Sequence, residues 1–322
     1  MNVLPLDKQV TVISLLVRGN SVRKTAEQAC VHRDTVLRLL REIGAGCAHL
    51  HDQRVRNLDS SIIEVDEIWS FIRKKENRRT KNDPKSWGDQ YTFVALDAIS
   101  KLVVSYHVGK RQASEAELFA NDIFSRLVVE PQITSDGWRP YIQAFENIFG
   151  SAMNYAMLVK MVSILDTLPA VPGQQHQPYS QIHVNEAVKT IISGNPDPAH
   201  FTTTHVERQN LTIRMECRRF SRKTLAHSKT LDNHKAAIAL HFAYYNFCRR
   251  HEAIRVTPAM ETDLATEVWT VADLILQARE AAELAMVQNQ PAQAIEVEED
   301  AIPDPPPVKL ADPNKVYATP PF

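Results

Sequence analysis

The sequence contains few cysteines, and their arrangement is not that of a metal-binding or disulfide-rich protein. Its 322 residues include four cysteines that form no C-x-x-C pair, at Cys30, Cys47, Cys217 and Cys248. This usage is typical of a reducing compartment and argues against a disulfide framework. Cys30-x-His32 and Cys47-x-His49 would offer four zinc ligands. Zinc sites, however, usually space paired cysteines by about two to four residues and paired histidines by about three to five. We therefore interpret Cys30 as a small apolar residue in a tight turn.

Other absences exclude several classes of protein. No apolar run approaches the roughly 18 residues of a membrane helix, and the first ten residues lack the basic and then apolar pattern of a signal peptide. We therefore expect a cytoplasmic protein with no membrane partner. The motifs G-x-S-x-G, G-x-x-x-x-G-K-[ST] and G-x-G-x-x-G are also missing, which argues against a serine hydrolase of that type, a P-loop enzyme and a Rossmann site.

The net charge of −1 hides an uneven distribution. Residues 261–322 carry 12 acidic and three basic residues, a net −9, so that residues 1–260 carry +8. Basic residues concentrate in two stretches: 73–85 holds seven against two acidic, and 205–256 holds eleven against four. Basic faces suit a phosphate backbone, although a single charge run is often just solvated surface. The distribution favours a nucleic-acid partner.

Residues 6–43 are predicted to form three short helices. The first carries an apolar stripe that ends at Gly19-Asn20, Ser21 is a suitable N-cap for the second, and the third follows a turn at residues 30–32. This order is typical of a helix-turn-helix, whose last helix enters the major groove. A small protein-interaction module is the alternative. The third helix would present to double-stranded DNA the side chains of Arg33, Thr35, Arg38 and Arg41.

The element order that follows is that of an RNase H-like fold. Strands are predicted at residues 61–66, 90–97, 101–109, 131–135 and 154–162, and helices at 114–127, 139–148, around Glu207 and at 231–249. The helix at 114–127 begins with a capping-box-like Ser114-x-x-Glu117. Three strands in a meander, then helix, strand, helix, strand and helix, indicate an α/β domain with a mixed five-stranded sheet flanked by helices.

The chain is accordingly divided into five segments. We expect a helix-turn-helix module over 1–45, a linker over 46–60, a catalytic domain over 61–260 with an insertion at about 171–204, a C-terminal helix over 261–287, and a tail over 288–322. The tail holds eight of the 18 prolines and an acidic cluster, which predicts disorder.

Three acids fall where this fold would place catalytic carboxylates. The ends of its first and fourth strands lie side by side, which brings Asp66 and Asp136 together, and a later helix carries Glu207. Cleavage of a phosphodiester suits two divalent cations about 4 Å apart, and hard Mg²⁺ prefers carboxylate ligands. Taken singly, each acid could be a surface, turn or helix-start residue. Glu64 shares the strand face of Asp66, so the pattern does not settle which of them binds metal; we expect Glu64→Gln to retain activity.

Three blocks of sequence resemble the IS1 family of bacterial insertion-sequence transposases. They are VDEIWSFIRKKE around Asp66, TSDGWRPY around Asp136 and THVERQNLTIRMECRRFSRKT around Glu207, and the resemblance continues in DNHKAAIALHFAYYNFCRRHEAIRVTPAM. It spans roughly residues 60–262. It implies a DDE triad of Asp66, Asp136 and Glu207, dependence on Mg²⁺ or Mn²⁺, and terminal inverted repeats as substrate. By the same resemblance, Arg214 matches a basic residue near the DNA phosphate, with Arg208 and Arg218 as further DNA contacts. The paired cysteines that members commonly carry before the helix-turn-helix are absent from this sequence.

These observations together predict a DNA transposase. It would cleave phosphodiester bonds at the element ends, join the freed 3′-OH to target DNA and act as a homo-oligomer at the nucleoid. Two alternatives use the same sequence features: a DNA-binding regulator derived from a transposase, and an RNase H-like nuclease without strand transfer.

Overall fold

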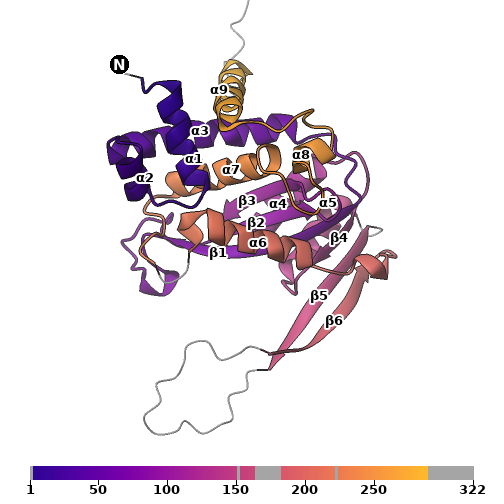
Figure 1. The fold of residues 1–322 in the computed structure, drawn as a ribbon. Coiled ribbons are helices and arrows are strands. Elements are labelled where there is room, and N and C mark those ends of the chain that lie inside the picture. The colour runs from indigo at the N-terminus through magenta and orange to yellow at the C-terminus, as the bar shows by residue number, and fades with distance from the viewer. Residues whose placement is uncertain (1–2, 151–152, 164–182, 222–223, 289–322) are drawn as a thin grey trace, which may run out of the picture.

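The computed structural model describes residues 3–150, 153–163, 183–221 and 224–288, and a mixed sheet lies at its centre (Figure 1). The strands in the described residues are β1 (Ile62–Ile72), β2 (Gly88–Asp97), β3 (Val103–Gly109), β4 (Gln132–Ser135), β5 (Asn154–Ser163) and β6 (His183–Ser193). They lie in the order β3-β2-β1-β4-β5-β6. The pairs β1–β2, β2–β3 and β5–β6 are antiparallel, and β1–β4 and β4–β5 are parallel. The arrangement of the first five strands is compatible with an RNase H-like fold.

The prediction of a five-stranded sheet is wrong by one strand. β6 lies within the residues expected to form an insertion, and it pairs with β5 as a hairpin that projects from the rest of the molecule (Figure 1). The segment His183–Ser193 contains alternating β-branched residues, but the surrounding proline- and glutamine-rich sequence concealed this signal. The remainder of the expected insertion includes the short helix η2 (Pro198–His200), and residues 171–182 lie outside the described residues.

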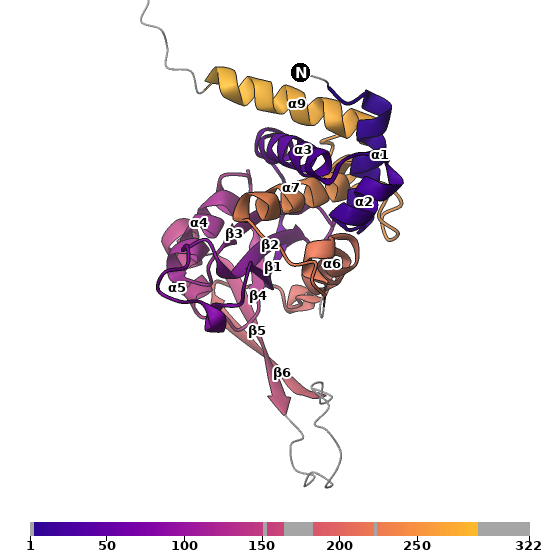
Figure 2. The ribbon, with the colours of Figure 1, turned by 90° about the vertical axis from the view of Figure 1, so that its left-hand side faces the viewer.

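Helices cover both faces of the sheet (Figure 2). On one face, α4 (Ala113–Phe124) and α5 (Pro140–Phe149) pack on Ile63, Val65 and Phe93. On the other face lie α6 (Thr204–Glu216), η3 (Arg218–Phe220) and α7 (Leu231–Phe247), in contact with side chains that include Ile68 and Val94. Alternate residues of β1 thus enter different cores, as the two-residue period of a strand requires. α4 begins at Ala113 with Gln112 at its N-cap position, so the predicted capping box at Ser114 does not form.

A second helical layer packs on α7 and contains α1 (Leu6–Val17), α2 (Val22–Gln28), α3 (Arg33–Arg54) and α9 (Val271–Gln288). The short α8 (Pro258–Glu261) joins α7 to this layer, and η1 (Glu76–Arg78) precedes β2. The bounds of α1 and α2 agree with the prediction, and the Ser21 side chain accepts from the backbone N–H of Lys24. The C-terminal helix begins at Val271, later than expected, and residues 289–322 of the predicted tail lie outside the described residues.

The expected linker is largely helical, because α3 continues to Arg54 instead of ending near Ile43. Gly44 and Gly46 fall at the start of the linker-like sequence, but both lie inside α3 at points of close helix contact. A Cβ atom at Gly44 would lie 2.4 Å from the carbonyl oxygen of Ala236 in α7, and one at Gly46 would lie 2.2 Å from that of Ala278 in α9. The two glycines therefore allow α3 to approach both neighbouring helices.

The possible zinc ligands near the N-terminus do not form a site. Cys30 is exposed in the turn before α3, with φ of +53°, and Cys47 is buried inside α3. The interpretation of Cys30 as a turn residue is therefore confirmed. In the described part of the chain, the one group of three or more metal-ligating side chains consists of carboxylates instead. Nor does any described helix combine the length and apolar character needed to cross a membrane.

Candidate metal-dependent active site

The register of the central strands brings Asp66 and Asp136 side by side. β4 pairs in parallel with β1 from Ile62↔Gln132 to Val65↔Ser135 and then ends. Asp66 and Asp136 are the next residues on the two strands, so the sequence-based prediction that they meet agrees with this register. β1 continues past this point because β2 pairs with it as far as Ile72. The acids therefore lie at an edge created where β4 stops.

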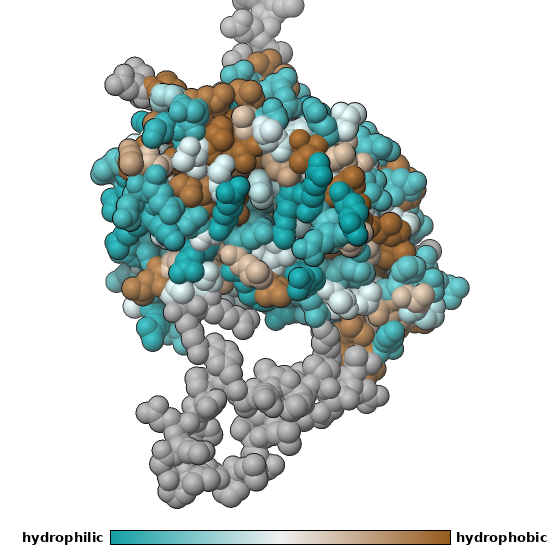
Figure 3. Space-filling model, in the orientation of Figure 1, coloured by the Kyte–Doolittle hydropathy of each residue, from teal (hydrophilic) through white to brown (hydrophobic). Residues whose placement is uncertain are grey.

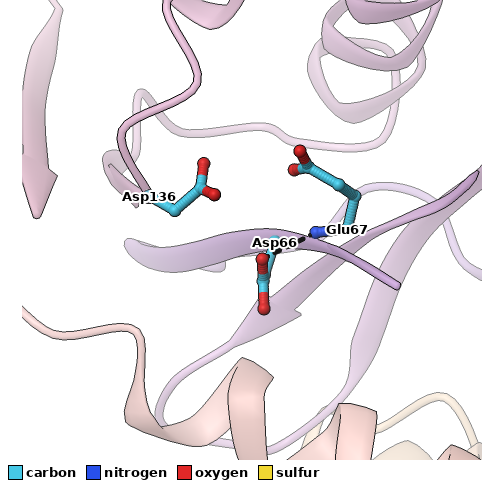
Figure 4. A group of neighbouring side chains, drawn as sticks. All are labelled: Asp66, Glu67 and Asp136. Atoms are coloured by element: carbon cyan, nitrogen blue, oxygen red, sulfur yellow. Dashed lines mark hydrogen bonds between the residues drawn. The ribbon is translucent and has the colours of Figure 1, made fainter. Parts of the chain in front are cut away.

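A third acid, Glu67, completes a group that sequence reasoning missed. Carboxylate oxygens of Asp66, Glu67 and Asp136 lie within 4.8 Å of one another, and we call these three residues the acidic cluster. Figure 4 shows that Asp66 and Glu67 leave opposite sides of β1, with Asp136 entering from the segment after β4. Alternate residues face opposite sides of a strand, and the side chain of Glu67 leaves β1 on the side away from Asp66. Because β4 ends beside this part of β1, side chains from both faces of β1 can approach the same group of carboxylates.

Burial and mutual repulsion make two of these carboxyl groups reluctant to ionise. The pKa of Asp66 is raised to about 6, first by desolvation and then by the charges of Asp136 and Glu207. The pKa of Glu67 is raised to about 7, again first by desolvation and then by Asp136. Hydrogen bonds from the backbone N–H of Glu67 and from Asn210 oppose the shift at Asp66. A cation bound at this site would stabilise the ionised carboxylates, because it would relieve their mutual repulsion.

The chain supplies one cation of its own to the acidic cluster, Arg111, which lies between β3 and α4. Its guanidinium forms an ion pair with Glu67, whose side chain is only 3% exposed, and lies 3.9 Å from Asp136. The same guanidinium lies over the ring of Trp138, 5.1 Å from the centroid. Tyr141 donates a hydrogen bond of 3.1 Å to the other oxygen of Glu67. Arg111 stands in a loop without periodic pattern, so the sequence offered no signal for it.

Glu207 lies near the acidic cluster without belonging to it. It is in the first turn of α6, on the helix predicted for it, and accepts a hydrogen bond of 2.7 Å from the hydroxyl of Thr203. Its charge contributes to the raised pKa of Asp66, which places the two carboxylates within electrostatic reach. One turn later, the Asn210 side-chain amide donates to Asp66 at 2.8 Å. Asp66 therefore interacts with Asp136 on one side and with α6 on the other.

Glu64 is not part of the acidic cluster but fixes the start of α6. Its side chain is 0% exposed and accepts hydrogen bonds from the backbone N–H groups of His205 (2.8 Å) and Val206 (3.0 Å). The His205 ring nitrogen Nδ1 lies 2.7 Å from the second oxygen. Thr203, at the N-cap position, makes no side-chain capping bond, so the carboxylate of Glu64 takes that role from a distant strand. Glu64 therefore contacts the start of α6, whereas Asp66 lies in the acidic cluster.

The donor set fits hard divalent cations. Carboxylates dominate the site, and the side-chain oxygen of the buried Asn210 has no hydrogen-bond partner in the protein. Mg²⁺ and Mn²⁺ prefer such oxygen ligands. Asp66 and Asp136 would hold cations at the end of β4, and Glu207 of α6 lies within electrostatic reach of Asp66.

The predicted DNA-binding residues lie mainly at the surface but on more than one face. Arg33, Arg38 and Arg41 of α3 are exposed and Thr35 is partly buried. Arg33 lines the same cavity as Arg218, whereas Arg41 lines a separate hollow beside α7. Arg208 is exposed on α6, and Arg214 is in the last turn of that helix. Figure 3 shows long hydrophilic side chains across the face that carries α6 and α7.

Comparisons with known proteins give a distant likeness to solved structures and no match in sequence. No protein-family model matches the chain, and no curated protein matches it. Among solved structures, the chain is similar to a piggyBac transposase in a synaptic complex with hairpin DNA, determined by cryo-EM. The TM-score is 0.41 and the identity 10%, over 90% of this chain and 73% of that one. No family model confirms the resemblance of the sequence blocks to the IS1 family.

Proposed function

We propose that the protein is a metal-dependent DNA transposase that cleaves phosphodiester bonds and transfers the freed 3′-OH to target DNA. The observation that supports this most strongly is the convergence of Asp66 and Asp136 at the end of β4, together with the charge of Glu207, which acts on Asp66 from α6. The sequence predicts the same three acids. Membership of the IS1 family, terminal inverted repeats as substrate and the triad Asp66, Asp136 and Glu207 all belong to this proposal.

The residues of the chain would act mainly by position and charge. Bound divalent cations would supply an activated water and neutralise charge on the leaving oxygen. Asp66, Asp136 and Glu207 would hold them, while Asn210 orients Asp66 and Glu64 fixes the helix that carries Glu207. Arg214, in the last turn of the same helix, would contact a DNA phosphate along α6. Such prearranged charges are worth more in a partly buried site than in water.

The surroundings of the site suit DNA as the substrate. Residues 205–256 carry a large excess of basic side chains, and α6 and α7, which they include, lie beside β1. Phosphate contacts by such residues give affinity without sequence specificity. We propose that Arg33, Thr35, Arg38 and Arg41 add sequence recognition from α3, and that joining two DNA ends requires a homo-oligomer.

The test replaces each proposed metal ligand by its amide. Asp66→Asn, Asp136→Asn and Glu207→Gln should each abolish Mg²⁺-dependent nicking and strand transfer on a plasmid carrying the DNA that flanks the gene. DNA binding in EDTA should be retained. Asp59→Asn, at an exposed position before β1, is the matched control and should behave like the parent. Mn²⁺ binding, followed by electron paramagnetic resonance, should weaken in the three variants and not in the control.

The outcomes separate the alternatives. Retained nicking in any one variant would remove that acid from the proposed triad. Nicking without joining of the 3′-OH would favour an RNase H-like nuclease. If the parent binds DNA but neither binds Mn²⁺ nor nicks with Mg²⁺ or Mn²⁺, the DNA-binding regulator is the better description.

A further inference from the structure

A cavity of about 740 Å³ lies between the N-terminal helices and the end of α6, away from the acidic cluster. Its walls come from the end of α1, the starts of α2 and α3, the segment around η3, and one side of α7. The volume is within the range of about 300–1,000 Å³ that is common for ligand pockets. Nothing in the proposed cleavage reaction requires this cavity.

Basic side chains dominate the charge of the cavity. Five lysine and arginine residues line it, namely Arg23, Arg33, Arg218, Arg219 and Lys229. The acidic lining residue is Glu216, which forms an ion pair of 2.8 Å with Arg249. Two of the cationic residues, Arg33 and Arg218, were selected from the sequence as DNA contacts, although they are 185 positions apart in the chain. Such a charge balance attracts an anion.

Part of the wall is apolar and suits a flat ring. Leu37 and Leu40 of α3 line the cavity together with Leu225, a leucine that is 89% exposed. An inorganic phosphate would use only the cations, whereas a nucleotide also has an apolar ring face that such leucines can cover.

Polar atoms without partners lie in the same wall. His241 is 3% exposed, and neither of its ring nitrogens has a hydrogen-bond partner. The Asn233 side-chain oxygen is buried and also lacks a partner. Buried polar groups are usually satisfied, so an unpartnered imidazole beside a cavity points to a ligand that completes it. Burial lowers the pKa of His241 to about 3, so the ring is neutral and offers one donor and one acceptor.

We propose that this cavity binds a nucleotide of a DNA strand, with its base against Leu37, Leu40 and Leu225, within reach of His241 and Asn233, and its phosphate among the basic residues. The proposal rests on the proposed function for the choice of DNA as the source of the nucleotide. Within α6, Glu207 is separated from Glu216, which lines the cavity, by about 14 Å along the helix axis. This distance corresponds to about four nucleotide steps of B-form DNA. A base that enters the cavity must be unpaired, so the strand would be single-stranded or locally open there.

The test compares a blunt duplex with the same duplex carrying three unpaired nucleotides, with binding measured by fluorescence anisotropy in EDTA. The parent should prefer the tailed duplex. His241→Leu should reduce that preference at least threefold and leave the melting temperature equal or higher, because it removes an unpartnered polar group from the interior. A histidine that only supports the fold would show the opposite pattern, with lower stability and unchanged preference, and that result would overturn the proposal.

Matched variants test the basic residues. Arg33→Gln and Lys229→Gln should weaken binding of the tailed duplex several-fold, whereas Lys235→Gln, an exposed lysine of α7 that does not line the cavity, should not. Equal losses of binding in all three variants would overturn the proposed nucleotide site. Displacement of the tailed duplex by micromolar dAMP would instead assign the cavity to free nucleotides and overturn its assignment to a DNA strand. Because the assay requires no cleavage, loss of the proposed enzymatic function would leave its result unaffected.

Discussion

Replacing Glu64 by glutamine should show how the start of α6 is held. The carboxylate is fully buried and accepts from two backbone N–H groups of the first turn of α6. Glutamine has nearly the same shape as glutamate but carries no negative charge. Its side-chain amide also replaces one acceptor oxygen by an NH₂ donor, which cannot accept a hydrogen bond from a backbone N–H group. Hydrogen bonds to a charged acceptor contribute about 1.5–3 kcal/mol each, and a charge at a helix start contributes about 0.3–1 kcal/mol or more.

We therefore expect Glu64→Gln to lower the free energy of unfolding by about 2–4 kcal/mol, measured by urea denaturation. This is a large part of the roughly 5–15 kcal/mol typical of a folded protein, but it should leave the variant folded. Nicking should also slow, and the Mg²⁺ concentration for half-maximal nicking should rise, because Glu207 and Asn210 move with the start of α6. This reverses the sequence-based expectation that Glu64→Gln would retain activity because Glu64 is not needed in the carboxylate cluster.

Glu146→Gln is the matched control, because Glu146 is exposed on α5. It should leave both the unfolding midpoint and the Mg²⁺ dependence unchanged. If Glu64→Gln behaves like this control in both measurements, then Glu64 does not cap α6 and the reasoning is refuted. A loss of stability with an unchanged Mg²⁺ requirement would show a structural role without any effect on the position of Glu207.

Three further predictions concern charge. Since the pKa values of Asp66 (about 6) and Glu67 (about 7) exceed their ordinary values of 3.8 and 4.5, the folded protein binds more protons than the unfolded protein between about pH 4 and pH 7. The metal-free protein should therefore lose stability as pH rises through this window. Adding Mg²⁺ at pH 8 should restore the lost stability. A thermal unfolding temperature that depends on neither pH nor Mg²⁺ would contradict this prediction. Arg111→Ala should raise the pKa of Glu67 further and destabilise the metal-free protein by about 1–3 kcal/mol at pH 8, with little change at pH 5, as urea denaturation at the two pH values would show. Arg38→Ala should weaken specific DNA binding by about 1–3 kcal/mol if this exposed side chain contacts a base edge, whereas equal losses on specific and random DNA would indicate a phosphate contact.

The parts of the fold with regular sequence periods were predicted well. The order of strands and helices placed Asp66 beside Asp136. The predicted end of the first strand at residue 66 is wrong, because β1 continues to Ile72, and only β4 ends at this point. A helix carries Glu207 as predicted, and the long helix α7 lies close to its predicted bounds. In these segments the local pattern and the tertiary packing favour the same structure.

The remaining features depend on contacts between distant segments. Gly44 and Gly46 are residues of a kind that is common in linkers. Their presence inside a helix is explained by the close approach of α7 and α9. Arg111 reaches Glu67 from a loop, and Glu64 meets a helix start about 140 residues later in the chain. No periodic pattern encodes such pairs, because each side chain is exposed or buried according to a partner that lies far away in sequence.

The continuity of α3 has a mechanical consequence. The helix begins at Arg33 and extends over 22 residues, a length of about 33 Å. Near its end, His51 lies 3.1 Å from the carbonyl oxygen of Val104 in the sheet. The arginines at its start are therefore connected to the sheet by a continuous helix and not by a flexible linker. Adding one residue within α3 would leave its reach almost unchanged but would turn those arginines by about 100° around the helix axis.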